Sequence, residues 1–297
     1  MNRYFRKIIN IRKVKRFLLP FFIAFGWFML TAFPILAILL FNRKFNFNST
    51  SGNLLTLWTS LFGIILLVIR YKGDPYYLPF AKKRMLHRYA KGFLFGLLLF
   101  AINWLFIFGL QGFHVRLAFS FSGIPILGLF LVGFIFQSMF EELVCRGYIM
   151  GYWLKRQKLL TACLANTIFF TLMNGFNSEF SVSAFLGIFL FGMLLSEIRL
   201  ITGNIWFCGA FHAAWNFAES RLFGVTVPGL SDSGMILKST NTGLSPFITG
   251  GTFGVEASWL TIGLYLALSF WVLSLLQKQK GKLYGTTIGA GPRQVDR

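Results

Sequence analysis

The chain has 297 residues, of which 56% are hydrophobic and only 13% are charged, whereas a soluble globular protein carries about 25% charged residues. With 38 Phe and a mean hydropathy of +0.65, this composition excludes a soluble enzyme, a disordered chain and a disulfide scaffold. The formal net charge of +20 comes from short basic clusters between apolar runs. Such clusters are typical of cytoplasmic loops of a membrane protein, and not of a nucleic-acid-binding face.

Eight apolar segments follow one another along the chain, and most approach the ~20 residues that a helix needs to cross a bilayer. They are 17–41, 52–69, 92–111, 122–145, 159–176, 182–198, 203–219 and 256–277. The fifth, sixth and seventh are short, so we expect them to be tilted or to lie inside the bundle. The sequence therefore predicts an all-α, polytopic membrane helical bundle with about eight transmembrane helices.

The basic residues predict the orientation of this bundle. With the N-terminus inside, 24 of the 29 Lys and Arg fall in the inner segments, as the positive-inside rule requires. We expect both termini to be cytoplasmic and the chain to be a multi-pass protein of the plasma membrane, in contact with the lipid bilayer. Residues 1–280 are predicted to form one domain and 281–297 a disordered cytoplasmic tail. The outer loop 220–255, rich in Gly, Ser and Thr, is either a connector or a lid.

The fourth segment carries ionisable residues, which are costly within a membrane and point to function. Its end reads FQSMFEELVCRGY, with Glu141, Glu142 and Arg146. Glu142 and Arg146 are four residues apart, so on a helix they share a face and can pair. Glu141 points about 100° away and is left free. The alternative is that this cluster only solvates a helix end at the inner membrane edge.

The fifth and seventh segments add polar residues at a similar depth. Asn174 lies as far from the inner turn at 155–158 as Glu141 does on the neighbouring segment, and His212 and Asn216 lie at a comparable distance from the next inner loop. Taken alone, each of these residues fits an interhelical hydrogen bond. Their agreement in depth predicts one buried polar site.

Such a site suits peptide hydrolysis. A glutamate beside His and Asn in a water-accessible pocket can act as a general base toward water, and His and Asn can donate hydrogen bonds to a developing oxyanion. Metal binding is the other use of these residue types, with Glu141 and His212 as candidate zinc ligands. A catalytic zinc usually takes three protein ligands, and the chain has only three His, so nitrogen ligands are lacking.

At these residues the chain resembles the CPBP family of CAAX-processing and bacteriocin-immunity (Abi) intramembrane proteases. That family has EExxxR on one span, FxxxH on the next and HxxxN or HxxxD further on. Here EELVCR (Glu141–Arg146) and HAAWN (His212–Asn216) match the first and third motifs, while the second reads FTLMN and ends at Asn174 in place of His. The resemblance covers about 90–220.

The resemblance implies a role for each matched residue. Glu141 would activate the hydrolytic water, assisted by the residue at 174, with Glu142 and Arg146 as supporting residues. The pair formed by His212 and Asn216 would polarise the scissile carbonyl or help to bind a metal.

The asparagine at position 174 leaves two hypotheses open, because Asn174 cannot accept a proton near pH 7. The first is an intramembrane endopeptidase that cleaves a membrane-associated peptide or protein, in bacteriocin maturation or self-immunity. The second is a catalytically impaired membrane scaffold that binds a peptide or partner protein in the same cavity. A transporter is disfavoured, because paired half-spans and repeat symmetry are not recognisable.

Overall fold

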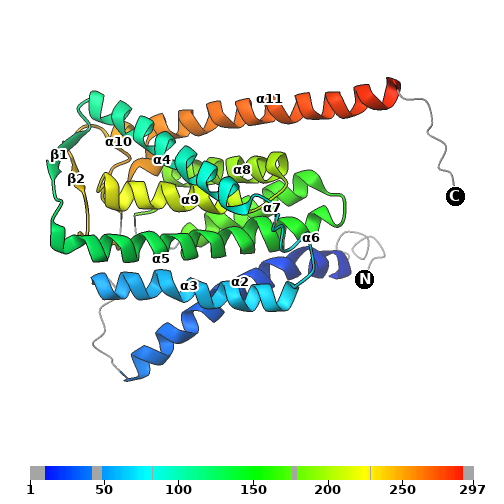
Figure 1. The fold of residues 1–297 in the computed structure, drawn as a ribbon, viewed down its shortest axis with the longest axis horizontal. Coiled ribbons are helices and arrows are strands. Elements are labelled where there is room, and N and C mark those ends of the chain that lie inside the picture. Colours follow the sequence, from blue (N-terminus) through cyan, green and yellow to red (C-terminus); the bar gives the residue numbers. More distant parts are fainter. Residues whose placement is uncertain (1–10, 42–48, 82, 176–178, 228, 290–297) are drawn as a thin grey trace, which may run out of the picture.

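The structure, a computed structural model, describes residues 11–41, 49–81, 83–175, 179–227 and 229–289. The helices of its first half are α2 (Ile11–Phe41), α3 (Thr50–Tyr71), α4 (Met85–Gly109), η1 (Phe121–Gly123), α5 (Ile124–Glu142), η2 (Leu143–Ile149) and α6 (Met150–Leu154). Those of its second half are α7 (Leu159–Asn174), α8 (Val182–Thr202), α9 (Trp206–Phe217), η3 (Ala218–Leu222), α10 (Pro246–Thr249), η4 (Val255–Ala257) and α11 (Trp259–Gly289). Two strands, β1 (Phe113–Leu117) and β2 (Leu237–Asn241), form a small antiparallel pair at one end of the helices (Figure 1).

The predicted class, a multi-pass helical membrane bundle, is confirmed. Six helices in the described part of the chain are long and apolar enough to cross a membrane, whereas α7 has 16 residues and α9 only 12. The sixth predicted segment is longer than expected: α8 continues to Thr202 because Arg199, placed in a loop by its charge, is buried within the bundle. The total of eight spans and the cytoplasmic side of the termini stay predictions.

Helix α9 has only 12 residues, and most of them are buried against neighbouring helices. It packs closely on α4, where Gly92 and Gly96 face it one helical turn apart. A Cβ at these glycines would lie 2.5 Å and 2.6 Å from the carbonyl oxygens of Phe207 and Phe211, so only glycine permits this approach. Neighbouring protein replaces lipid around such a helix, and His212 is thereby held at the centre of the bundle.

The helix that carries the EELVCR motif changes its winding within the motif. It runs without a break from α5 through η2 to α6 and ends at Leu154. The middle part, η2, is a π-helix, a wider form that often occurs at functional sites. Glu141 and Glu142 thus end the α-helical part, and Arg146 lies in the π-helical part.

The β1–β2 pair was not expected from the sequence. Its register joins Phe113 to Asn241, so it ties the α4–α5 connection to the 220–255 segment. That segment is not structureless: it contains η3, β2, α10 and η4, and the fully buried Arg221 donates hydrogen bonds to the carbonyl oxygens of Ser231 and Ser233 at 2.8 Å and 2.5 Å.

Both ends of the described chain lie at the end of the bundle opposite the strands, where α2 begins and α11 finishes (Figure 1). This placement supports termini on the same side of the membrane. The disordered tail 281–297 stays a prediction. Helix α11 as described extends to Gly289, and residues 290–297 lie outside the described part.

Candidate active site

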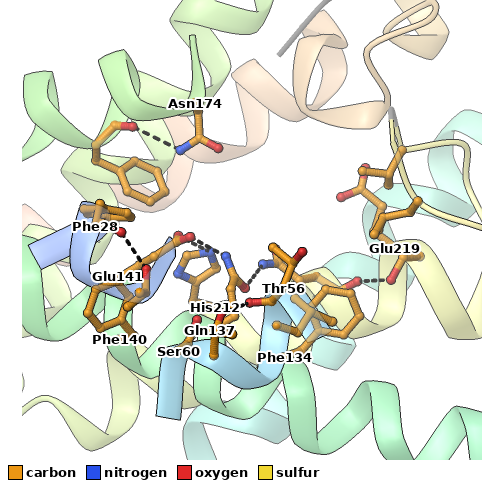
Figure 2. A pocket seen from close by; sticks show the side chains of 18 of the residues that line it. Phe28, Thr56, Ser60, Phe134, Gln137, Phe140, Glu141, Asn174, His212 and Glu219 are labelled. Carbon is orange, nitrogen blue, oxygen red and sulfur yellow. Dashed lines mark hydrogen bonds and ion pairs between the residues drawn. The ribbon is translucent and has the colours of Figure 1, made fainter. Parts of the chain in front are cut away.

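One cavity of about 470 Å³ lies between the helices, with walls from α2, α3, α5, α7, α8 and α9 and from η3 and η4 (Figure 2). It brings together four of the six predicted site residues. The other two, Glu142 and Arg146, are fully buried behind its wall. The four that line the cavity are Glu141, Asn174, His212 and Asn216.

Behind the cavity wall, Glu142 Oε1 contacts the side chains of both Arg146 and His212. Arg146 Nη1 donates to Glu142 Oε1 at 2.8 Å, as the four-residue spacing predicts, and His212 Nδ1 lies 3.1 Å from the same oxygen. Arg146 Nη2 also donates to the carbonyl oxygen of Gly192 on α8 at 2.8 Å. The partner on Nδ1 fixes which ring nitrogen of His212 faces the cavity, and that nitrogen is Nε2.

Two aromatic rings complete the surroundings of His212. The rings of Phe170 and Phe191 meet the imidazole edge-on, with centroids 5.7 Å and 5.3 Å from it. The Arg146 guanidinium lies 4.6 Å from the centroid of the Phe170 ring, a distance at which a cation–π interaction forms. Phe170, the first residue of FTLMN, thus contacts both the imidazole of His212 and the guanidinium of Arg146.

Glu141 is the carboxylate that reaches into the cavity, with 17% of its side chain exposed. Its Oε2 lies 3.8 Å from His212 Nε2, a separation that leaves the two groups without a direct hydrogen bond. Its Oε1 accepts a hydrogen bond from Gln137 Nε2. Asn216 Nδ2 in turn donates to Gln137 Oε1 at 3.2 Å, so Asn216 reaches Glu141 through Gln137.

Gln137 was missed by the sequence analysis, although a signal was present. It precedes Glu141 by one helical turn and therefore shares its face. Two further glutamates that line the cavity, Glu219 in η3 and Glu256 in η4, were not predicted from the sequence. Both stand at the ends of apolar segments, where a charged residue is easily taken for a helix end.

Asn174 lines the cavity but stays apart from the other predicted residues. Its Nδ2 donates to the carbonyl oxygen of Phe170 in its own helix at 3.0 Å. In Figure 2 it lies across the opening from Gln137 and Glu141. The asparagine at this position therefore makes no contact that would let it assist Glu141.

The donor atoms of the cavity do not fit a catalytic zinc. Glu141 and His212 Nε2 are the two candidate ligands, and within the described ranges no group of three or more His, Cys, Asp and Glu side chains is placed to hold a metal. The amide nitrogens of Asn174 and Asn216 are donors already engaged with oxygen acceptors. A zinc site needs about three protein ligands that converge on one point. Here Glu141 and His212 are close together, but the other two carboxylates of the cavity, those of Glu219 and Glu256, do not complete such a group.

Taken together, the fold and the cavity define a multi-pass helical membrane protein with a buried glutamate–histidine site. Residues 122–218 match the family model described as Rce1-like, type II CAAX prenyl endopeptidase. This segment runs from η1 to the start of η3 and contains EELVCR, HAAWN and the altered second motif FTLMN, so the resemblance to the CPBP family is confirmed over it. No curated protein and no solved structure matches the chain.

Proposed function

We propose that the chain is a CAAX-type intramembrane endopeptidase in which Glu141 activates the attacking water. The observation that carries this proposal is the position of the Glu141 carboxylate: partly exposed in the cavity and 3.8 Å from His212 Nε2. A water bound to Glu141 Oε2 would then be next to a histidine whose orientation is already fixed. General bases placed in this way typically contribute ~10²–10⁴-fold to the rate.

The reaction proceeds in two steps. Glu141 takes one proton from water while the water oxygen forms a bond to the carbonyl carbon of the substrate. His212, protonated on both nitrogens, donates from Nε2 to the resulting oxyanion, and Glu142 stabilises the imidazolium through Nδ1. The C–N bond then breaks, Glu141 returns its proton to the leaving amine, and a carboxylic acid and an amine are formed.

Three residues act by positioning. Gln137 occupies Glu141 Oε1 and so leaves Oε2 for water and His212, while Asn216 holds the amide of Gln137 in the required orientation. Arg146 pairs with Glu142 beside His212, because a buried carboxylate needs a cation or hydrogen-bond donors as partners.

The substrate class follows from the family and from the environment of the cavity. The cavity lies between the helices of a membrane bundle, so we infer that its substrate is a peptide or protein associated with the membrane. A precursor peptide of a bacteriocin, or a protein of the self-immunity system, in the plasma membrane is the family-level candidate.

One observation favours a second function. The asparagine that replaces the family histidine is hydrogen-bonded to its own helix and does not contact Glu141, as a scaffold that has lost catalysis would allow. In that case the same cavity binds a peptide without cleaving it.

Glutamine at position 141 distinguishes the two functions. Purified chain in liposomes is incubated with a farnesylated CAAX peptide, and products are identified by mass spectrometry. We expect Glu141→Gln to lower the cleavage rate about a hundredfold or more. The matched control is Glu197→Gln, which changes a buried glutamate of α8 that does not line the cavity, and it should cleave as the wild type does.

Cleavage by Glu141→Gln at the wild-type rate would refute the water-activating role of Glu141. Binding of the peptide without any cleavage by the wild type would instead establish the scaffold.

A further inference from the structure

The cavity is acidic in a strongly basic protein. The chain carries a net charge of +20 and only nine Asp and Glu, yet three of these nine line this cavity. None of the described residues that line it is Lys or Arg. The proposed chemistry uses one of the three carboxylates, so two are unexplained. The three are Glu141, Glu219 and Glu256.

Glu219 is held almost completely out of solvent. It lies in the π-helical η3, one turn beyond Asn216, and is 5% exposed. The described residues give its carboxylate no ion pair, and the backbone N–H of Val255 lies close enough to it to favour its charged form. A carboxylate has about four acceptor positions, so most of those of Glu219 are left for something inside the cavity.

Glu256 faces the same space from η4. Its backbone is fixed against α8, since a Cβ at Gly187 would lie 1.9 Å from the Glu256 carbonyl oxygen. Its carboxylate is near enough to those of Glu219 and Glu141, and to His212, to interact with them electrostatically.

A buried donor lies beside the pair. The indole of Trp215 is fully buried next to Glu256, and its N–H lacks a hydrogen-bond partner of normal geometry among the described residues. A donor in this place favours an ionised carboxylate. Two ionised carboxylates close together in a largely buried cavity repel each other, so the pair must share a proton or bind a cation.

We propose that Glu219 and Glu256 form a binding subsite for a basic side chain, lysine or arginine, of the substrate peptide. The subsite adjoins Glu141 within the same cavity, so one extended peptide can occupy both. A single metal ion would leave most of a 470 Å³ cavity unfilled and would find two carboxylates where calcium takes six to eight oxygen ligands. The statement that the ligand is a substrate rests on the proposed function. The preference of the cavity for a basic side chain does not depend on that function.

The test measures binding, so that its result is independent of cleavage. The probe is a farnesylated, fluorescein-labelled peptide with one lysine moved along it position by position. Norleucine at the same position is the control, because it keeps the alkyl chain and removes the ammonium group. Dissociation constants are measured by fluorescence anisotropy on the full chain in nanodiscs, with Glu141→Gln as the background to prevent turnover.

At one position we expect the lysine peptide to bind about tenfold more tightly than the norleucine peptide, the order expected of a charge-assisted contact. The preference should fall below about threefold in the double variant Glu219→Gln/Glu256→Gln, on the same energy scale. Glu197→Gln, a buried glutamate outside the cavity, should retain it. If the double variant does not fold, Glu256→Gln alone should show the smaller preference.

Equal binding of lysine and norleucine peptides at every position, or a preference that survives the substitutions, would overturn the subsite. So would tight binding of Ca²⁺ or Mg²⁺ that is lost in the double variant, which would make it a metal site. A lysine preference in a chain that cleaves nothing would support the subsite while refuting the protease.

Discussion

At the scale of single residues, Glu142 links the EELVCR and HAAWN parts of the site. The spacing in EELVCR predicted its ion pair with Arg146, because four residues make one helical turn. The contact with His212 was not predictable in the same way, since it joins α5 to α9 and depends on how these helices pack. The same holds for Gln137, whose contact with Asn216 exists only in the folded chain.

The substitution Asn174→His tests whether position 174 limits catalysis. We expect the peptidase rate to rise by at least about tenfold, because imidazole can share the proton that Glu141 takes from water, and such groups contribute ~10²–10⁴-fold. Initial rates with the farnesylated peptide give the result. The matched control is Asn174→Ala, which removes the same amide and should not gain activity. A histidine variant no faster than the alanine variant would contradict this expectation.

The substitution Gln137→Leu tests the positioning of Glu141. It keeps the size of the side chain and removes its amide, so we expect kcat to fall about tenfold with little change in KM, the order of a hydrogen bond to a charged group. Thr56→Val is the control, since Thr56 lines the cavity but donates to its own helix at Gly52. A rise in KM alone would assign Gln137 to substrate binding.

At the scale of elements, the long helices could be predicted and the short ones only in part. A membrane span reveals itself through local composition, which a sequence displays directly. The strand pair could not be found in this way, because β1 and β2 are short, polar in part and stabilised by each other across the chain. The π-helical winding of η2 likewise could not be predicted from the EELVCR motif.

The contact of α4 with α9 can be tested with Gly92→Ala. The added methyl would meet the Phe207 carbonyl oxygen at 2.5 Å, and we expect a loss of about 1–3 kcal/mol of stability from overpacking. Gly26→Ala is the control, because a Cβ on α2 at this site meets nothing within 4 Å. Thermal midpoints in detergent that fall equally for both variants would argue against the close contact.

The connection between α3 and α4 contains an acid-sensitive contact. Burial acts to raise the pKa of Asp74, but hydrogen bonds from Lys155 and from the N–H groups of Tyr76 and Tyr77 hold that pKa below its usual value. A lowered folded-state pKa means that the stabilisation is present above the unfolded pKa of about 3.9 and is lost as the pH falls through the folded value.

We therefore expect Asp74→Asn to lower the thermal midpoint at pH 7 and to remove part of the loss of stability below about pH 4. The midpoint is measured from neutral pH to about pH 2. Asp232→Asn is the control, because the Asp232 side chain is 60% exposed and should change little. An acid transition that is the same in Asp74→Asn and in the wild type would show that another group causes it.

At the scale of the whole molecule, the arrangement of the helices leads to a prediction about orientation. The partition of Lys and Arg predicts that α2 begins and α11 ends in the cytoplasm and that residues near 235 lie outside. Reporter fusions at residue 235 and at the C-terminus should report opposite sides of the membrane. Reports from the same side would show that the number of crossings after η3 is wrong.

The β1–β2 ladder also dictates the order in which a growing chain can complete the molecule. Phe113 in β1 can pair only after its partner Asn241 in β2 has been synthesised, and Glu256 is synthesised later still. The helices that carry Glu141 and His212 therefore leave the ribosome before the opposite wall of the cavity has been made. During synthesis the water-activating half of the cavity is therefore made first, without the second pair of carboxylates. A chain interrupted between η3 and β2 carries the EELVCR, FTLMN and HAAWN segments and still lacks an enclosed chamber around them.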